Sequence, residues 1–458
     1  MKSVLLIDFG STYTKLTAVD ADSGKLLGTA ADHTTQDTDI SEGLTEALNK
    51  LHEKIGKIEY TKRLACSSAA GGLRMVACGL VPELTAKAAK MALLGAGAKL
   101  VGLYSYQLTE NDRDEIDDSS PDILLLAGGT DGGNRACILH NAEILATTKH
   151  SFPIIIAGNR TCAKEVAALL KDKPVFLVDN VMPMLNTLNI EPARKKIREI
   201  FLEKIINAKG LSSLSDLISG IIMPTPAAVL SAMELLSGGC EDEKGLGELM
   251  AVDLGGATTD VYSIAAGLAD GVNVIYKGLP EPFSKRTVEG DVGMRYTAEG
   301  ILESAGLSRA ASLAGLKETE VQNYTEKLRK TIGSLPQNDK EKALDFALAA
   351  LAVETATMRH CGSLEEVYTA TGQAFLQMGK DLRKVKKVIM TGGALIHADR
   401  KSELAQFALY SDKQPQSLRP ERAELLFDKQ YIIAAMGLLG AYFPKAALRI
   451  LKNELVTI

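Results

Sequence analysis

The chain has 458 residues, of which 46% are hydrophobic and 24% are charged, and its formal net charge is −5 at pH 7. This length predicts two or three domains, and so small a negative charge argues against a general affinity for nucleic acid or anionic membranes. Tryptophan is absent and aromatic residues make up only 5%, which argues against a platform that stacks single-stranded bases.

The cysteines and the apolar runs predict a cytoplasmic protein. No two cysteines form a CxxC pair, and the histidines show no metal-binding spacing beside them, so we expect buried free thiols in a reducing compartment. The N-terminus shows no signal segment, and the longest apolar runs are too short to span a bilayer. The six cysteines are Cys66, Cys78, Cys137, Cys162, Cys240 and Cys361.

In chain order, short apolar runs alternate with stretches of helical periodicity, which predicts an α/β protein. An acidic run at 111–120 is expected as a surface loop, and residues 307–345 as exposed helices. The expected strands are 3–8, 14–19, 123–127, 153–157, 174–178, 250–254, 259–264 and 387–391. The expected helices are 192–209, 225–236, 343–358 and 430–441.

The Gly-rich, acidic segment SGGCEDEKGLG, at 237–247, is the expected linker between two halves of the chain. We expect a first lobe over 1–247, with an inserted α/β segment at about 65–190, and a second lobe over 248–458. Two helices rich in small residues are expected to connect the lobes, namely 225–236 and 430–441.

One pattern occurs twice, as LLIDFGSTYTK at 5–15 and AVDLGGATTDVYS at 251–263. In each copy an apolar strand runs into Asp-x-Gly and then into small hydroxyl residues. Such a turn exposes amide N–H groups that bind phosphate oxygens, and its Asp can hold Mg²⁺ through water. Two copies predict that MgATP is gripped by one turn from each lobe. The alternative is that Asp8 and Asp253 only cap their own turns.

The neighbouring residues complete the predicted nucleotide site. Lys15 either reaches a phosphate or points to solvent. A third strand ends in VIMTGGALIHA, where the bend at Gly392, Gly393 and Ala394 is expected to lie against the base and ribose. Contacts to the β- and γ-phosphates are expected from Gly10, Ser11, Thr12, Gly255, Gly256 and Thr258.

The order of these motifs resembles the ATPase superfamily of actin, the Hsp70 chaperones and the sugar kinases. DLGGATTD is similar to the second phosphate motif of the Hsp70 group, TPAAVLSA to its first connecting helix and AAMGLLGA to its second. The resemblance implies a two-lobed actin-like ATPase with duplicated ribonuclease H-like lobes and inserted α/β segments. It implies that Asp260 orients the attacking water or only fixes its turn, and that Asp291 and Gly293, in EGDVGMR, lie near the nucleotide.

A narrower resemblance covers nearly the whole chain. Seven motifs in order are similar to the MutL/GlmL family, which is associated with adenosylcobalamin-dependent glutamate mutase and related aminomutases and is unrelated to mismatch-repair MutL. The resemblance implies an ATP-dependent reactivating factor that uses ATP and Mg²⁺, binds mutase subunits and releases their damaged cobalamin. The motifs are DFGSTYTK, CSSAAGGLRM, LLAGGTDGGN, NVMP, IMPTPAAV, DLGGATTDVYS and VEGDVGMR.

Some features leave the function open. Thr225 stands where Hsp70 proteins have a Glu, and no base Asp of the sugar-kinase type can be placed, so we expect slow hydrolysis that suits a switch. A small-molecule kinase and a filament-forming actin-like protein are the alternatives. LLAGGTDGGN is either a ligand loop or a strand-to-helix turn, and CSSAAGGLRM either faces an anion or lies at a partner surface.

Overall fold

A computed structural model describes residues 2–10, 13–34, 40–68, 73–208, 222–241, 243–268, 271, 273–331, 333–370 and 372–457. The chain forms two compact units. Unit 1 comprises Met1–Ala232, Gly278–Pro282 and Ile433–Ile450. Unit 2 comprises Met233–Lys277, Phe283–Ile432 and Leu451–Ile458.

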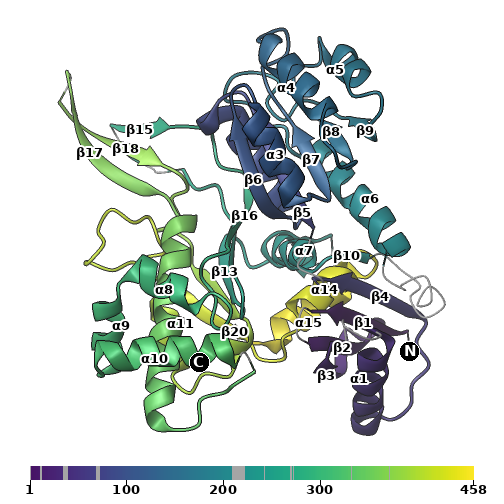
Figure 1. Cartoon of the computed structure of the whole chain (residues 1–458). Helices are drawn as coiled ribbons and strands as arrows, with labels where there is room; N and C mark the ends of the chain where they lie inside the picture. Colours follow the sequence, from purple (N-terminus) through teal and green to yellow (C-terminus); the bar gives the residue numbers. More distant parts are fainter. Residues whose placement is uncertain are drawn as a thin grey trace. The chain divides into compact units, whose positions relative to one another are not determined.

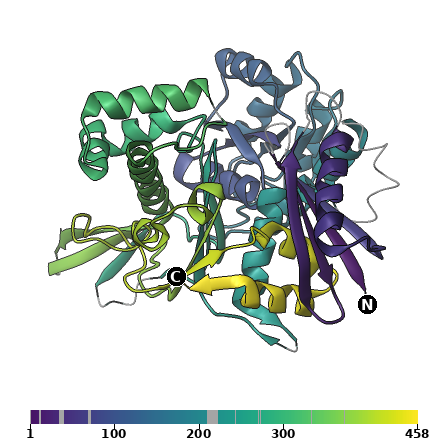
Figure 2. The ribbon, with the colours of Figure 1, turned by 90° about the horizontal axis from the view of Figure 1, so that it is seen from below.

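The first sheet of unit 1 contains the N-terminal hairpin. Its strand order is β10-β4-β1-β2-β3, in which the hairpin strands are antiparallel and β1, β4 and β10 are parallel. This is a ribonuclease H-like order, and helix α1, Ile40–Ile55, packs on the sheet (Figures 1 and 2). The strands are β1 Ser3–Phe9, β2 Tyr13–Asp20, β3 Lys25–His33, β4 Lys62–Ser67 and β10 Ile222–Pro224.

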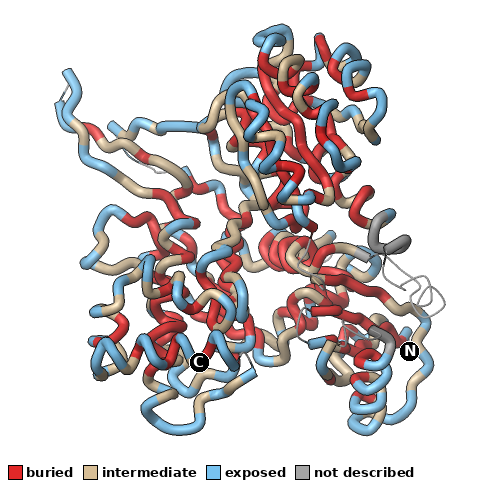
Figure 3. Tube along the Cα trace, viewed as in Figure 1, coloured by how far each residue is buried: buried red, intermediate tan, exposed pale blue. Residues whose placement is uncertain are grey.

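Between β4 and β10 the chain builds a wholly parallel sheet in the order β6-β5-β7-β8-β9, as in a doubly wound α/β domain. Helices α2 and α6 cover one face and α3, α4 and α5 the other, so the central strands β5, β7 and β8 are buried on both sides (Figure 3). The strands are β5 Arg74–Gly79, β6 Lys99–Ser105, β7 Ile123–Leu126, β8 Ile154–Ile156 and β9 Val175–Leu177. The helices are η2 Pro82–Ala86, α2 Lys87–Gly95, α3 Glu110–Ser119, α4 Ala136–Ala146, α5 Ala163–Leu169 and α6 Glu191–Ala208.

Within unit 1, the first part of one helix crosses a second helix at a glycine. Helix α7, Thr225–Gly238, follows β10 directly, and α14, Ile433–Gly440, packs on β1 and β4. A side chain at Gly437 would collide with the backbone carbonyl of Ala228, so the close approach of the two helices requires glycine. Helix α15, Pro444–Glu454, follows α14.

The segment Gly278–Pro282 packs in unit 1, although the strands on either side of it belong to unit 2. Leu279 is fully buried in the apolar cluster formed by α2 and α6. Lys87, the first residue of α2, forms an ion pair with Glu281 at 2.9 Å. The core of the inserted domain is therefore completed by residues from the second half of the sequence.

Five strands of the main sheet of unit 2 repeat the strand order of the first sheet of unit 1, and β21 is added at one edge, antiparallel to β20. The full order is β16-β14-β13-β19-β20-β21, with β13, β14 and β16 antiparallel and β13, β19 and β20 parallel. The chain thus contains two ribonuclease H-like sheets, which confirms the predicted fold class. The strands are β13 Leu249–Leu254, β14 Thr259–Ile264, β16 Ser284–Glu289, β19 Lys387–Thr391, β20 Glu424–Asp428 and β21 Leu455–Thr457.

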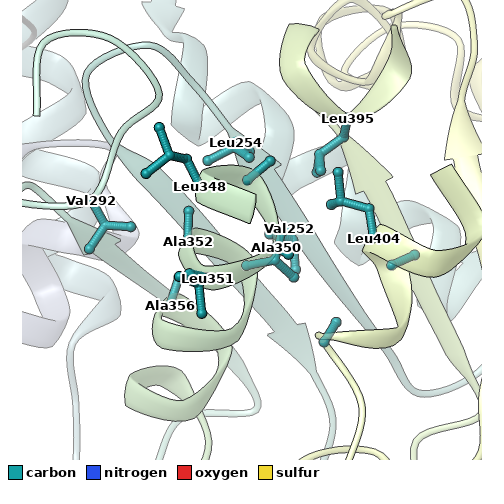
Figure 4. Close-up of a cluster of buried hydrophobic side chains, with 14 of the residues drawn as sticks. Val252, Leu254, Val292, Leu348, Ala350, Leu351, Ala352, Ala356, Leu395 and Leu404 are labelled. Carbon is teal, nitrogen blue, oxygen red and sulfur yellow. The ribbon is translucent and has the colours of Figure 1, made fainter. Parts of the chain in front are cut away.

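Helix α11, Asp339–His360, covers this sheet and forms the centre of the unit 2 core. Val252 and Leu254 of β13 lie in one apolar cluster with Leu348 and Leu351 of the helix (Figure 4). The other helices are α8 Ala298–Ala305, α9 Leu307–Ala314, α10 Glu318–Lys330, α12 Gly393–Ile396 and α13 Lys401–Gln406. Two small sheets consist of β15 Val274–Lys277, β17 Ser363–Thr369 and β18 Gly372–Met378, and of β11 Gly239–Cys240 and β12 Glu243–Lys244.

One predicted segment is wrong. The sequence predicts a loop at 111–120, but these residues lie mainly in α3, because Thr109 and Asp112 form a capping box at its start. The expected linker, 237–247, contains the hairpin β11–β12. All six cysteines are free, as predicted, and Cys240 is the one that is only half-buried. Within the described ranges, no helix has both the length and the hydrophobicity to cross a membrane.

Candidate functional site

The first hairpin, residues 8–15, has a tight turn with a glycine at its corner. Gly10 donates its N–H to the carbonyl oxygens of Asp8 and Tyr13, at 3.1 and 3.0 Å. A Cβ at position 10 would lie 2.6 Å from the Tyr13 oxygen, so a larger residue would force the turn to open. The predicted phosphate contacts Ser11 and Thr12 lie outside the described residues.

Asp8 lies near the end of β1 and is only 6% exposed, with its carboxylate among donors from three elements. Thr225, the first residue of α7, donates its hydroxyl to Oδ1 at 2.6 Å, and Cys66 Sγ lies 3.4 Å from the same oxygen. Lys15 faces Asp8 across the hairpin with its Nζ 3.4 Å from Oδ2. Burial, together with the Asp8 charge, raises the pKa of the Cys66 thiol, so this thiol stays protonated as a donor.

The second hairpin, residues 253–260, repeats this geometry in unit 2. Gly255 donates its N–H to the Thr258 carbonyl at 3.0 Å, and Asp253 faces Asp260 across the strands. The tip residues 256 and 257 are exposed, and their N–H groups meet no backbone acceptor among the residues described. Those amides are therefore suitable for binding phosphate oxygens.

A loop at 290–297 clamps the second hairpin. The N–H groups of residues 294–296 donate to the carbonyl oxygens of Gly255 and Gly256, at 2.8 to 3.0 Å. A side chain at Gly293 would collide with the backbone of this turn, which explains the glycine at that position. The structure thus brings Gly293 against the predicted phosphate turn.

The predicted nucleotide residue Asp291 lies on the exposed side of this loop. Arg359 Nη1 lies 2.8 and 2.9 Å from its two oxygens, and this hydrogen bonding lowers the pKa of the Asp291 carboxyl. The same nitrogen lies 2.9 Å from Glu289 at the end of β16. Arg359 therefore ties the loop to helix α11, and a nucleotide contact of Asp291 stays a prediction.

Asp260 is buried in an ion pair with Arg286 of β16. Nε and Nη2 of Arg286 lie 2.7 and 2.6 Å from Oδ1, and the Thr258 hydroxyl lies 3.3 Å from Oδ2. Burial opposes the guanidinium charge, but Asp260 and Tyr262 outweigh it and raise the pKa of Arg286. This pairing agrees with a role of Asp260 in fixing the turn, and orientation of the attacking water stays a prediction.

The Gly-Gly bend after β19 packs directly on the end of β13. Gly392 has φ 97°, and a Cβ there would collide with the Leu254 backbone and lie 2.8 Å from Oδ1 of Asp253. Gly393 begins α12 and has open space where a Cβ would lie, whereas Ala394 is half-buried. The predicted adenosine bend and the second Asp thus lie together at the carboxyl ends of parallel strands.

Each hairpin has an Asp near the end of its first strand, Asp8 or Asp253, together with backbone or side-chain donors, which suits a hydrated Mg²⁺ and a polyphosphate. Mg²⁺ prefers oxygen ligands and keeps most of its waters, so one carboxylate per hairpin fits a metal held through water. No cluster of three or more His, Cys, Asp or Glu occurs in the described part of the chain, so a cage made wholly of protein ligands is not seen there. Lys15 would supply positive charge toward a phosphate.

Sequence reasoning missed three groups that support the two hairpins and the Gly-Gly bend. Cys66 contacts Asp8, Arg286 pairs with Asp260, and Asp428, at the end of β20, accepts a hydrogen bond from Thr391, just before the bend, at 3.1 Å. Cys66 and Asp428 end parallel strands next to β1 and β19, so correct strand pairing would have found them. Nothing local in the sequence marks Arg286 as the partner of Asp260.

Two ribonuclease H-like sheets, each carrying an Asp-x-Gly hairpin on its first two strands, define the actin-like class of ATPase fold. The family model described as MutL protein matches residues 4–455. The chain is 47% identical over 462 residues to Protein MutL of Clostridium tetanomorphum, with 100% of each chain covered. The chain therefore belongs to the MutL family.

The chain also shows weaker likeness to solved structures. Nucleotide-free acetone carboxylase is 13% identical, with 95% of this chain and 69% of that chain covered and a TM-score of 0.41. The activator of the 2-hydroxyisocaproyl-CoA dehydratase from Clostridium difficile with bound ADPNP is 9% identical, with 100% and 99% covered and a TM-score of 0.35. A glycerol dehydratase reactivase is 10% identical, with 96% and 99% covered and a TM-score of 0.32.

Proposed function

We propose that this protein is an ATP-dependent reactivating factor for an adenosylcobalamin-dependent aminomutase such as glutamate mutase. The observation that carries the nucleotide part of the proposal is the repeated hairpin, with an Asp at the end of the first strand and a Gly at the turn in both units. The mutase part is supported by membership of the MutL family. The six free thiols fit a reducing compartment such as the cytoplasm.

In this proposal, MgATP is bound through both hairpins. The Asp8 and Asp253 carboxylates hold the hydrated metal ion, and the amides at 256 and 257 contact phosphate oxygens. Gly393, which is exposed and has open space where a Cβ would lie, gives the adenosine close access to the backbone. Bound Mg²⁺ would supply charge neutralisation of the phosphates.

ATP hydrolysis is proposed to be slow. Thr225 donates its hydroxyl to Asp8, and a neutral hydroxyl is too weak a base to take a proton from the attacking water as a carboxylate would. Asp260 is neutralised by Arg286. A long-lived ATP state suits a switch whose ATP and ADP forms bind a mutase differently.

The test is the binding of an inactivated mutase holoenzyme to the full chain with ATP, with ADP and without nucleotide. Couplings of this kind are about 1–3 kcal/mol, so the affinities in ATP and ADP should differ by roughly 5- to 150-fold. Mutase activity should return only when ATP and fresh coenzyme are both present. Equal affinity in all three conditions would contradict the proposal, and transfer of phosphate to a small acceptor would favour a kinase.

A further inference from the structure

We propose that Thr225 is a positioning residue for Asp8: its hydroxyl fixes Oδ1, so that Oδ2 stays oriented beside Lys15 toward a hydrated metal ion. This inference rests on the proposed function, because the metal ion is that of MgATP. It goes further by assigning the geometry of the first hairpin to a residue 217 positions away in the sequence.

Strand register places Thr225 beside Asp8. Asp8 pairs with Cys66 across β1 and β4, and Cys66 pairs with Met223 across β4 and β10. The chain leaves β10 two residues later and begins α7 at Thr225, between Pro224 and Pro226. The backbone therefore largely determines where the Thr225 hydroxyl lies, since the side chain has only one rotatable bond before its oxygen.

Helix α7, which carries Thr225, is held in position by close packing against α14. Gly437 of α14 packs against the Ala228 carbonyl, one turn into α7, with no room for a side chain between them. A small displacement of the start of α7 would have to move this crossing. The position of the hydroxyl is thus fixed on both sides, by β10 before it and by the crossing after it.

The hydrogen bond is suited to orienting a carboxylate. At 2.6 Å it is short, and its acceptor is charged, which makes such bonds stronger than neutral ones. The Cys66 thiol lies 3.4 Å from the same oxygen, so both donors converge on Oδ1 and neither on Oδ2. A carboxylate at position 225 would face Asp8 with like charge, whereas a hydroxyl adds none.

The experiment compares Thr225→Val, which removes the hydroxyl and keeps the branched shape, with Thr225→Ser, which keeps the hydroxyl. ATP affinity is measured by titration calorimetry over a series of Mg²⁺ concentrations and again in excess chelator. We expect Thr225→Val to bind MgATP about tenfold more weakly, equal to about 1.4 kcal/mol, and to need more Mg²⁺ for half-maximal binding. Thr225→Ser should resemble the wild type, and metal-free ATP binding should be alike in all three proteins.

The possible results separate the two proposals. If the wild type binds no MgATP, the proposed function and this inference both fail. If the wild type binds MgATP and Thr225→Val matches it at every Mg²⁺ concentration, only the positioning role is overturned. A loss that is equal with and without metal, or equal in the valine and serine variants, would overturn it too. If Thr225→Val does not fold, Thr225→Ala provides the hydroxyl-free variant and the same comparison applies.

Discussion

The two hairpins share a backbone geometry but are supported by different means. In the first hairpin, side chains hold the Asp: Thr225 and Cys66 contact one oxygen of Asp8 and Lys15 the other. The second hairpin is supported by backbone hydrogen bonds and a buried ion pair. N–H groups of the loop 290–297 donate to the turn carbonyls, and Arg286 neutralises Asp260.

This difference predicts that the Asp8 carboxylate can change its orientation more easily than the turn of the second hairpin can change its conformation. A carboxylate held by side-chain donors can be reoriented by one substitution without unfolding the sheet around it. A turn clamped by backbone bonds and a buried charge pair cannot change without loss of packing. We therefore expect the loss of a side-chain support of Asp8 to alter metal and nucleotide binding, and the loss of the buried ion pair of the second hairpin to alter stability first.

The largest effect is expected from Arg286→Met. Removing one partner of a buried ion pair leaves Asp260 charged and unpaired, so the free energy of unfolding of unit 2 should fall by about 3–5 kcal/mol. The matched change in the first hairpin, Lys15→Met, removes a longer and more exposed pair and should cost about 0–1 kcal/mol. Denaturant unfolding of both variants measures this, and equal losses would show that the hairpins are supported alike.

Gly392→Ala should have the next largest effect. Its φ of 97° is unfavourable for alanine, and the new Cβ would collide with the Leu254 backbone, so we expect a loss of about 3 kcal/mol. Gly393→Ala is the control, because nothing lies within 4 Å of its would-be Cβ, and it should change stability by less than about 0.5 kcal/mol. A tolerated Gly392→Ala would contradict the close packing of this bend on β13.

A smaller difference is expected between the two turn glycines. A Cβ at Gly10 would lie 2.6 Å from the Tyr13 carbonyl, and one at Gly255 would lie 3.0 Å from that of Thr258. Gly10→Ala should therefore cost about 1–3 kcal/mol and Gly255→Ala about 1 kcal/mol or less. Thermal unfolding of the two variants gives the order, and the reverse order would mean that the space beside each turn glycine does not decide the cost.

The smallest predicted effect is a pH dependence of unit 2. His360 is fully buried between Ser263 and Thr287, and burial, with Lys285 and Lys380 nearby, lowers its pKa well below the usual value. The unfolded chain therefore takes up a proton near pH 6.5 that the folded one does not, and stability should fall as the pH drops below that value. At pH 5.5 the loss should be about 1.4 kcal/mol.

His360→Gln, compared with the wild type, isolates this contribution. Its stability should change less between pH 7 and pH 5.5 than that of the wild type, whatever its absolute stability. An identical pH dependence of the two proteins would exclude His360 as its source.

The strands and the repeated turn were accessible from the sequence because their signals are local. Continuous apolar runs predict 3–8, 123–127 and 387–391, which correspond to β1, β7 and β19. The hydrophobic pattern does not predict helix α3, because the segment is acidic and has almost no apolar residues. The local signal for this helix is the capping box that Thr109 and Asp112 form at its start.

The supports of the hairpins could not be predicted in the same way, because they depend on register between distant strands. Arg286 reaches Asp260 only because β14 and β16 pair with Val288 opposite Asp260. The sequence shows Thr225 as a departure from the Hsp70 pattern, but the contact of Thr225 with Asp8 depends on the position of α7 in the fold. Contacts of this kind follow from tertiary structure and not from any spacing in the sequence.

MgATP binding by the wild type, Asp8→Asn and Asp253→Asn tests the central claim most directly. A ligand that binds only the folded state at 100 times its dissociation constant stabilises that state by about 2.7 kcal/mol, so the melting temperature of the wild type should rise with MgATP. Both variants should melt near the wild type without nucleotide and lose most of that rise. If both variants gain as much stability from MgATP as the wild type, the hairpins do not bind the nucleotide.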